Sequence, residues 1–259
     1  LALASGVTPE KGIYTAITAG FVISFLGGNR VQIAGPTAAF ATIVAGIVAK
    51  NGMDGLIIAT LLAGVILILM GFLRLGNLIK FIPYTITTGF TSGIAVTIFI
   101  GQIKDFLGLT IVSEEPLIET MDKLKAVFQF ISTTNLQALL VGVISLLILI
   151  VWQYLPGFCK KIPPSLIAVL VGSAMVALLN MNVNTIGDLY EISNKLPTIS
   201  LPSFSLKTVQ NVLPDAFTIA ILAAIESLLS CVVADSMVNS RHRSNMELIA
   251  QGAGNITSA

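Results

Sequence analysis

The sequence predicts an all-α membrane protein, and three observations support this prediction. Of the 259 residues, 55% are hydrophobic and only 10% are charged, and the mean hydropathy is +0.93. A soluble domain of this length needs more charge to cover its surface, whereas lipid solvates the outside of a membrane bundle. Several apolar runs also reach the roughly 20 residues that an α-helix needs to cross a hydrocarbon core of about 30 Å.

Three helices are predicted in the first part of the chain. The polar sequence GVTPEKG (6–12) predicts a turn, so the first complete helix is expected at 13–26. Pro36 has a fixed φ that suits a first helical turn, which predicts a helix over 36–49. The run 56–73 is predominantly apolar and ends before Arg74, as expected of a spanning helix.

Further helices are predicted in the rest of the chain. The run 86–103 is apolar and rich in Thr and Gly, which should let helices pack closely. Residues 117–131 have the spacing of an amphipathic helix that lies at the membrane surface. Polar residues 180–210 contain Pro197 and Pro202 and predict a loop. The remaining predicted helices are 136–155, 166–179, 214–233 and the beginning of another at 246–259.

The charge and the reactive residues exclude several other classes of protein. The formal net charge is +1, and no basic patch with interleaved aromatic side chains indicates a nucleic-acid partner. Cys159 and Cys231 lack a CxxC spacing, and the single histidine, His242, excludes an ordinary His-rich metal site. Because the sequence contains no recognisable catalytic dyad or metal cluster, we expect neither an enzyme nor a resident cofactor.

The distribution of positive charge predicts which helix ends face the cytoplasm. Alternating crossings divide the basic residues evenly, but one side receives every arginine and the Lys160–Lys161 pair in short loops. Basic residues in short loops near helix ends carry most weight in the positive-inside rule. We therefore predict a multi-pass protein of the plasma membrane whose cytoplasmic side holds Arg30, Arg74, Arg241 and Arg243.

The segment 31–50 predicts a broken helix. From Pro36 to Lys50 a helix rises about 22 Å, which is less than the hydrocarbon core. If Lys50 reaches an interface, Val31–Ala34 must cross the remaining depth as extended backbone, and such backbone survives there only against protein or water. The alternative is a Gly-Pro kink in an ordinary membrane helix; the short helix after Pro36 favours the broken form.

A helix that begins inside the membrane predicts an anion site. Its free N–H groups and the positive end of its dipole attract an anion without a formal cation. Every Lys and Arg of the chain falls at a helix end or in a loop, so an anion held at the midplane would have to use backbone dipoles. The predicted substrate-binding residues are Gly35, Pro36, Thr37, Ala38, Ala39 and Phe40.

Glu226 is predicted to bind the coupling ion. It lies about 18 Å along the predicted helix from Pro214, and a carboxylate at that depth needs a partner, a proton or water. Ser227 is adjacent and Ser230 follows one turn later, so Glu226 and Ser230 offer oxygen ligands for Na⁺, while Glu226 alone is a candidate proton carrier. The alternative is a structural carboxylate bonded to a neighbouring helix; the usual role of intramembrane ionisable residues favours function.

Three blocks of the sequence resemble the sulfate permease (SulP) family of anion transporters, in its bacterial form. They are GNRVQIAGPTAAF (28–40), IPYTITTGFTSGIAVTIFIGQIKDFLGL (82–109) and AIESLLSCVVADSMVNSRHRSNMELIAQGAGNI (224–256). The resemblance implies a transporter fold of the uracil-permease type, built from two inverted repeats of seven segments each. It also implies that this chain holds the first repeat and the start of the second, with a broken third helix.

The resemblance also implies a domain organisation. Residues 1–80 would form core helices from the end of segment 1 to segment 4, and 81–180 the gate helices of segments 5–7. Residues 181–213 would form an extracellular loop, and 214–259 the core helices of segment 8 and the start of segment 9. The chain is expected to begin and end within helices, so segment 10 onward and a cytoplasmic STAS domain would lie outside it.

For the site, the resemblance supports the two candidate groups. The half-helix at Gly35-Pro36-Thr37 matches the third segment, whose amino terminus lines the anion site. Glu226 and Ser230 match the positions of the coupling cation in Na⁺-dependent members. Those members carry Asp where this chain has Glu226, which favours H⁺ over Na⁺.

These features predict symport of a small inorganic anion, such as sulfate or bicarbonate, through an elevator-like movement of the core. An uncoupled anion channel or exchanger of the same family and a nucleobase permease of the same fold are the alternatives. The expected partners are the anion and the lipid bilayer; a homodimer remains open, and no nucleic acid is expected.

Overall fold

A computed structural model describes residues 2, 5–33, 35, 37, 40–77, 84–112, 117, 119–157, 161–189 and 202–259, with the backbone alone at 84, 86, 87 and 90. Every regular element in these ranges is a helix. The chain divides into two compact units, the first formed by Leu1–Ile94 and Ile192–Ala259 and the second by Ala95–Glu191. The boundary falls within α3 (Tyr84–Leu107). The assignment of core and gate domains stays a prediction.

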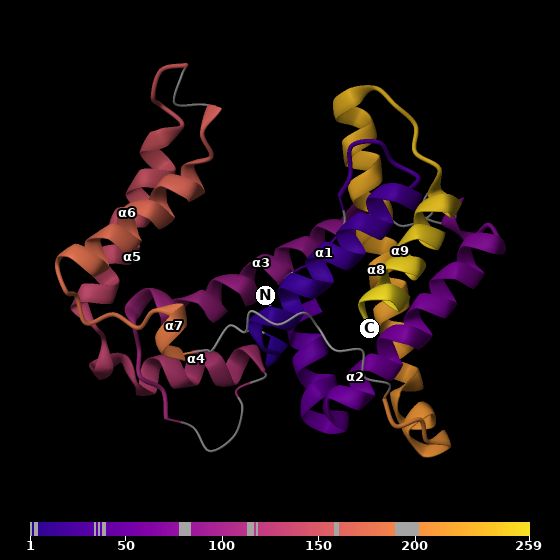
Figure 1. Ribbon diagram of the computed structural model, residues 1–259, viewed down its shortest axis with the longest axis horizontal. Helices are drawn as coiled ribbons and strands as arrows, with labels where there is room; N and C mark the ends of the chain where they lie inside the picture. The colour runs from indigo at the N-terminus through magenta and orange to yellow at the C-terminus, as the bar shows by residue number, and fades with distance from the viewer. Residues whose placement is uncertain are drawn as a thin grey trace. The chain divides into compact units, whose positions relative to one another are not determined.

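The first unit contains α1 (Pro9–Leu26), α2 (Ala41–Phe72), α8 (Leu206–Val238) and α9 (Ser244–Ser258). Helix α2 packs against both α8 and α9, and α1 packs against α9, so segments from the two ends of the sequence lie side by side (Figure 1). The core includes the fully buried side chains of Ile58, Leu67, Val212 and Leu248.

Helix α1 begins earlier than the sequence analysis predicted. The helix starts at Pro9, so the end of the expected turn at 6–12 is already helical. Proline lacks an N–H that the first helical turn would leave unbonded, and Glu10 places a negative charge near the positive end of the dipole. These two residues therefore extend the helix toward the amino terminus.

Helix α2 consists of two helical stretches that meet at Gly52. This glycine has φ 68° and ψ −171°, a conformation that other residues rarely adopt. The break separates the predicted helices 36–49 and 56–73. The regular helix begins at Ala41 rather than at Pro36, after a turn in which the Phe40 N–H donates to the Thr37 carbonyl over 3.2 Å.

Close backbone contact joins α2 to α9. A Cβ atom on Gly64 would lie 2.7 Å from the Gly252 carbonyl oxygen, and one on Gly252 would lie 2.5 Å from the Gly64 carbonyl oxygen. Only glycine allows this approach, which small residues commonly provide between membrane helices. In contrast, Gly89 and Gly93 in α3 have no atom within 4 Å of an added Cβ among the described residues. Within the described residues, close packing of this kind is therefore seen between α2 and α9 and not at Gly89 or Gly93.

Helix α8 also differs from the prediction, because Pro214 lies inside it rather than at its start. The helix begins at Leu206, so 206–210 is helix and not loop. Val212 is fully buried in the core and Val209 packs against it. Burial of this apolar face therefore stabilises helical turns ahead of the proline, despite the hydrogen bond that Pro214 cannot donate.

The second unit contains the elements that follow α3. They are α4 (Thr120–Gln129), the 3₁₀ turn η4 (Ile131–Thr133), α5 (Leu136–Trp152), α6 (Pro164–Leu178) and the short α7 (Ile186–Leu189). Helices α5 and α6 pack together, and Asn135 caps α5 by accepting hydrogen bonds from Gln137 N and Ala138 N. Helix α7 lies in the region that was predicted to be a loop.

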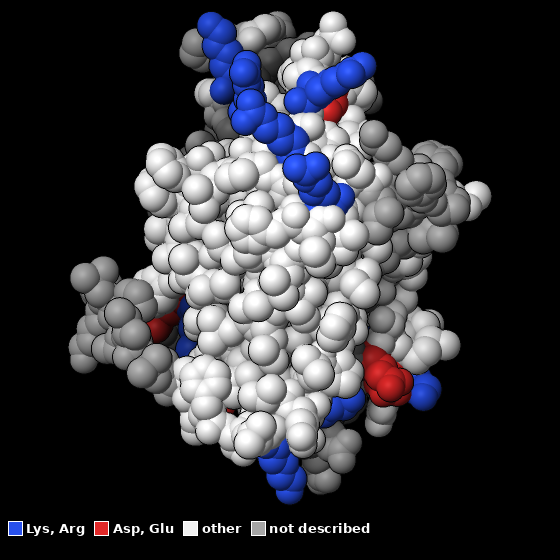
Figure 2. Space-filling view, turned by 90° about the vertical axis from the view of Figure 1, so that its right-hand side faces the viewer, with Lys and Arg blue, Asp and Glu red and all other residues white. Residues whose placement is uncertain are grey.

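Among the described residues, α2 and α8 are long and apolar enough to cross a membrane, and α5 and α6 are shorter apolar helices. Figure 2 shows one face of the molecule, on which charged residues lie at the upper and lower ends while the broad middle carries no charge. Such an uncharged band is the surface that a protein presents to lipid tails.

Candidate functional site

Residues 27–33, which follow α1 and contain no helix (the extended segment), are attached to the start of α9. A Cβ on Gly28 would lie 2.2 Å from the Arg243 carbonyl oxygen, so only glycine fits there. The Gly28 carbonyl accepts a hydrogen bond from Arg243 N over 2.9 Å, and Asn29 Oδ1 accepts one from Val31 N over 2.9 Å. These contacts shape the segment that leads to Thr37.

Thr37 and Glu226 meet directly. The Thr37 hydroxyl donates to Glu226 Oε2 over 3.0 Å, although 189 positions separate the two residues in the sequence. Both side chains are partly buried, and Glu226 lies in α8, which packs against α2. The structure therefore brings a residue of the predicted anion group together with the predicted coupling residue.

The other predicted substrate residues occupy different environments. Gly35 is exposed, whereas Phe40 is partly buried and packs against the hydrophobic core. Pro36, Ala38 and Ala39 lie outside the described residues. The described part of the group thus consists of one exposed glycine, the Thr37 hydroxyl beside Glu226, and a core aromatic side chain at the start of α2.

The two serines predicted beside Glu226 do not bond to it in the described part of the chain. Ser227 is buried, and its hydroxyl donates to Glu247 Oε1 over 2.8 Å. Ser230 is exposed on α8. No group of three or more Asp, Glu, His or Cys side chains that could hold a metal occurs among the residues that the structure describes.

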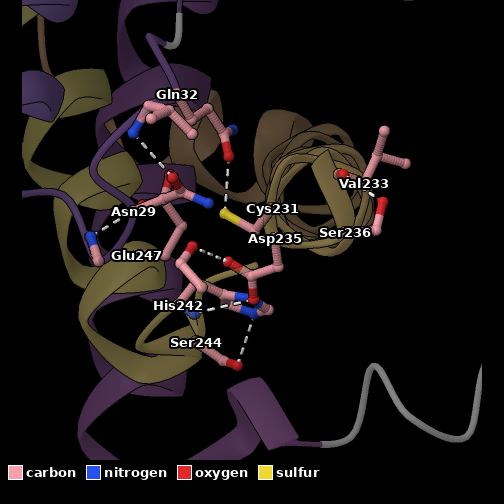
Figure 3. A network of polar contacts seen from close by, with 12 residues as sticks. Asn29, Gln32, Cys231, Val233, Asp235, Ser236, His242, Ser244 and Glu247 are labelled. Atoms are coloured by element: carbon pink, nitrogen blue, oxygen red, sulfur yellow. Dashed lines mark hydrogen bonds and ion pairs between the residues drawn. The ribbon is translucent and has the colours of Figure 1, made fainter. Parts of the chain in front are cut away.

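A buried polar network lies next to the Thr37–Glu226 pair and centres on Glu247. This carboxylate in the first turn of α9 is 1% exposed. It accepts hydrogen bonds from Gly28 N over 2.9 Å and from Gln251 Nε2 over 3.1 Å, in addition to the one from Ser227. Figure 3 shows Glu247 together with Asn29, Gln32 and Cys231, which come from the extended segment and from α8.

The sequence analysis missed Glu247. The residue stands near the start of a predicted helix and next to the basic loop that contains Arg241 and Arg243, where a carboxylate is usually solvated and interacts with the helix dipole. One signal was present in the sequence: Glu247 and Gln251 are one helical turn apart and share a face. Only the packing of α9 against the extended segment and α8 buries that face.

The local charges leave Glu226 without a basic partner in the described part of the chain. The ion pairs there are Lys125 with Asp122, over 3.3 Å, and His242 with Asp235, over 2.7 Å. His242 also lies 2.9 Å from the Ser244 hydroxyl, and Figure 3 shows these side chains at the connection between α8 and α9. A carboxylate without a basic partner inside a membrane bundle is suited to bind a proton or a cation.

The fold and this site together define a class of protein, a polytopic membrane transporter with an interrupted helix beside a buried carboxylate. The chain belongs to the sulfate permease family, which it matches over residues 1–259. The membership supports the predicted all-α fold, the multi-pass location in the plasma membrane, and a transporter rather than an enzyme.

The chain is similar to curated members of this family. It is 41% identical over 257 residues to a candidate sulfate transporter, YvdB of Bacillus subtilis (strain 168), covering 98% of this chain and 48% of that protein. It is 33% identical over 269 residues to the bicarbonate transporter BicA of a Picosynechococcus species, covering 99% of this chain and 46% of that protein. The chain thus spans about half the length of these relatives.

Solved structures show the same fold. The transmembrane domain of a cyanobacterial bicarbonate transporter, BicA, matches with a TM-score of 0.82 and 30% identity, covering 99% of this chain and 66% of that one. SLC26A9 matches with a TM-score of 0.79 and 20% identity, covering 99% and 44%. This likeness confirms the predicted inverted-repeat transporter fold.

Proposed function

We propose that the full-length protein is a secondary active transporter of small inorganic anions of the sulfate or bicarbonate class, coupled to H⁺ or Na⁺. The hydrogen bond from Thr37 to Glu226, 3.0 Å long, carries this proposal. This bond links Thr37, which belongs to the segment expected to bind the anion, to Glu226, which is expected to bind the cation. The names of the similar proteins, which refer to sulfate and bicarbonate, support the class of anion.

The contact between Thr37 and Glu226 provides a physical basis for coupling. At an effective dielectric constant of about 20, two like unit charges roughly 5 Å apart repel each other by about 3 kcal/mol, which lowers affinity about a hundredfold. A proton or Na⁺ at Glu226 removes this repulsion and releases the Thr37 hydroxyl, which can then donate to the anion. By linkage, the bound anion raises the affinity for the cation by the same factor.

The start of α2 supplies the positive potential for the anion. The first-turn N–H groups of this helix, which begins at Ala41, lack partners within the helix. The positive end of the helix dipole adds to their attraction for a negative ion. In this proposal the anion binds between Gly35 and Phe40, and no basic side chain takes part.

The coupling ion that we favour is H⁺. Ser227 already donates to Glu247 and accepts from Gln32 and Gln251, so its hydroxyl has no free position for a cation. A Na⁺ ion bound by Glu226 and Ser230 would need further oxygen ligands. A proton needs only the carboxylate.

An elevator-type movement is consistent with where the two groups lie. Thr37 and Glu226 both belong to the first compact unit, so one rigid movement can carry the anion and the cation together. We propose that the helices of 1–80 and 214–259, which lie in this unit, act as the mobile core and that the helices of 81–180 act as the gate.

The test is substitution of Glu226 in the full-length protein reconstituted into liposomes. Glu226→Gln removes the charge that must be neutralised, so uptake of labelled sulfate or bicarbonate should no longer respond to a H⁺ or Na⁺ gradient, while expression stays normal. Glu226→Asp should keep part of the response because it keeps the carboxylate.

Asp122→Asn is the matched control, since it neutralises an exposed carboxylate that pairs only with Lys125 on the surface. This variant should behave as the unaltered protein. Gradient-driven uptake that persists unchanged in Glu226→Gln would remove Glu226 from the coupling mechanism.

A further inference from the structure

The network around Glu247 contains a chain of hydrogen bonds whose direction is fixed by its chemistry. Ser227 Oγ accepts from Gln251 Nε2 over 2.9 Å and from Gln32 Nε2 over 3.3 Å. Both partners are amide nitrogens, which only donate, so the single hydroxyl hydrogen of Ser227 must go to Glu247. That bond is 2.8 Å long.

Glu247 is then the acceptor in each of its hydrogen bonds. Its Oε1 atom receives the Ser227 hydroxyl and the Gln251 amide, and its Oε2 atom receives the Gly28 N–H over 2.9 Å. A protonated carboxyl group would present a hydrogen to one of these donors. The arrangement therefore fits an ionised carboxylate, which the first turn of α9 also favours.

At the other end of this series of hydrogen bonds, the contact of Cys231 with Gln32 also has a fixed direction. The Cys231 thiol donates to Gln32 Oε1, so the Gln32 amide nitrogen is directed toward Ser227. Figure 3 shows Cys231, Gln32 and Glu247 in this arrangement, with the Asn29 amide nitrogen facing the sulfur atom. Cys231 is fully buried, so its thiol finds its partner, Gln32, within the protein.

The network attaches both ends of the extended segment to the rest of the first unit. Gly28, at one end, is bonded to Glu247 directly. Gln32, at the other end, reaches Glu247 through Ser227, and Ser227 is the residue next to Glu226. Thr37 follows on the same segment and bonds to Glu226. One buried charge on α9 thus holds the backbone that places the Thr37 hydroxyl against Glu226.

We infer that Glu247 is a positioning residue for transport: as an ionised carboxylate it orients the Ser227–Gln32–Cys231 chain and so keeps the segment 28–32 in place beside Glu226. The inference rests on the proposed function of Thr37 and Glu226. We assign the coupling ion to Glu226 rather than to Glu247, because both oxygens of Glu247 already accept hydrogen bonds.

The test combines uptake kinetics with the reactivity of Cys231, in a full-length variant in which Cys231 is the only cysteine. Glu247→Gln places an amide donor opposite the Ser227 hydroxyl or the Gly28 N–H, so the network must rearrange. We expect a rise of about tenfold or more in the KM for the anion, the usual effect of losing a charged hydrogen bond. We also expect faster labelling of Cys231 by N-ethylmaleimide, with normal expression and thermal stability sufficient for purification.

Two further variants separate positioning from simple stability. Glu247→Asp keeps the charge, so its KM for the anion should lie close to that of the unaltered protein. Glu247→Gln combined with Gln251→Glu moves the carboxylate by one turn, where it still reaches Ser227 while the amide oxygen accepts from Gly28, and it should restore both the KM and the slow labelling. Should Glu247→Gln fail to fold, these two variants still test the inference, because each predicts a KM and a labelling rate near those of the unaltered protein.

The outcomes distinguish the inference from the proposed function. Faster labelling with an unchanged KM would make the network purely structural and overturn the inference. An altered KM with unchanged labelling would show that Glu247 acts by another route, which would also overturn it. If Glu226→Gln leaves coupling intact while Glu247→Gln still exposes Cys231, the proposed function fails and the described network stands.

Discussion

At the scale of single residues, the two carboxylates near the interrupted helix differ in how many donors surround them. Glu247 accepts from three donors and is 1% exposed. Glu226 accepts from the Thr37 hydroxyl and is only partly buried. Both oxygens of Glu247 thus already accept hydrogen bonds, whereas Glu226 has more lone pairs free to bind a proton or cation. This difference is the basis for the separate roles that we propose for the two acidic groups.

This difference predicts the effect of Thr37→Val, which replaces the hydroxyl by a methyl group of similar size. The anion loses a donor and Glu226 loses its bond from Thr37, so the KM for the anion should rise about tenfold. Thr37→Ser keeps the hydroxyl and should stay within about threefold of the unaltered protein. Uptake kinetics on protein of matched expression would measure both, and equal KM values for Val and Thr would exclude Thr37 from the site.

The sequence alone could identify Glu226 but not its neighbours. A carboxylate in the middle of an apolar run is easy to recognise, and the short helix predicted after Pro36 indicates that a helix starts nearby inside the membrane. The 3.0 Å contact with Thr37 could not be predicted, because it depends on how α2 packs against α8. Glu247 was missed for the same reason, since its position in the sequence resembles that of a solvated residue at a helix start.

At the scale of elements, the apolar runs predicted most of the helices, but their starts depended on packing. Pro214 was expected to begin a helix and lies inside α8, since Val212 ahead of it is fully buried. The start expected at Pro36 was also early, because regular helix begins at Ala41. In both cases proline chemistry indicated the neighbourhood of a helix end but not the residue, which in α8 depends on the burial of Val212.

The contact of α2 with α9 predicts a loss of stability on Gly64→Ala. The added Cβ would lie 2.6 Å from Ile256 Cγ1 and 2.7 Å from the Gly252 carbonyl oxygen, which is closer than packed atoms tolerate. Overpacking of this kind costs about 1–3 kcal/mol, so the thermal unfolding temperature in detergent should fall by several degrees.

Gly46→Ala is the matched control, because it lies on the same helix and none of the described residues has an atom within 4 Å of its added Cβ. Alanine is a better helix former than glycine, so this variant should be as stable as the unaltered protein or slightly more stable. If both variants unfold at the same temperature, the backbones of α2 and α9 are not in tight contact.

At the scale of the whole molecule, the uncharged middle of the face in Figure 2 and the match to the sulfate permease family agree on a membrane-embedded transporter. The choice of anion is a separate matter, because helix dipoles recognise charge and size. The two compact units support movement of one part of the protein against another.

The prediction at this scale concerns which substrates the protein takes up, and a panel of substrates tests it. Full-length protein in liposomes should take up sulfate or bicarbonate, and a H⁺ gradient should increase that uptake. Uracil and xanthine should not compete, because a dipole-based site has no reason to prefer a neutral base. Under voltage clamp, a current carried by the anion alone that ignores both the H⁺ and the Na⁺ gradient would instead indicate an uncoupled channel.

The glycine contact between α2 and α9 has a mechanical consequence. Where two main chains touch, no side chain is present whose rotation could absorb shear between them. The contact of Gly64 with Gly252 therefore joins a helix near the beginning of the chain rigidly to one near its end. In the proposed elevator movement, deformation would therefore have to occur away from this contact, and α2 and α9 would move together as one rigid part.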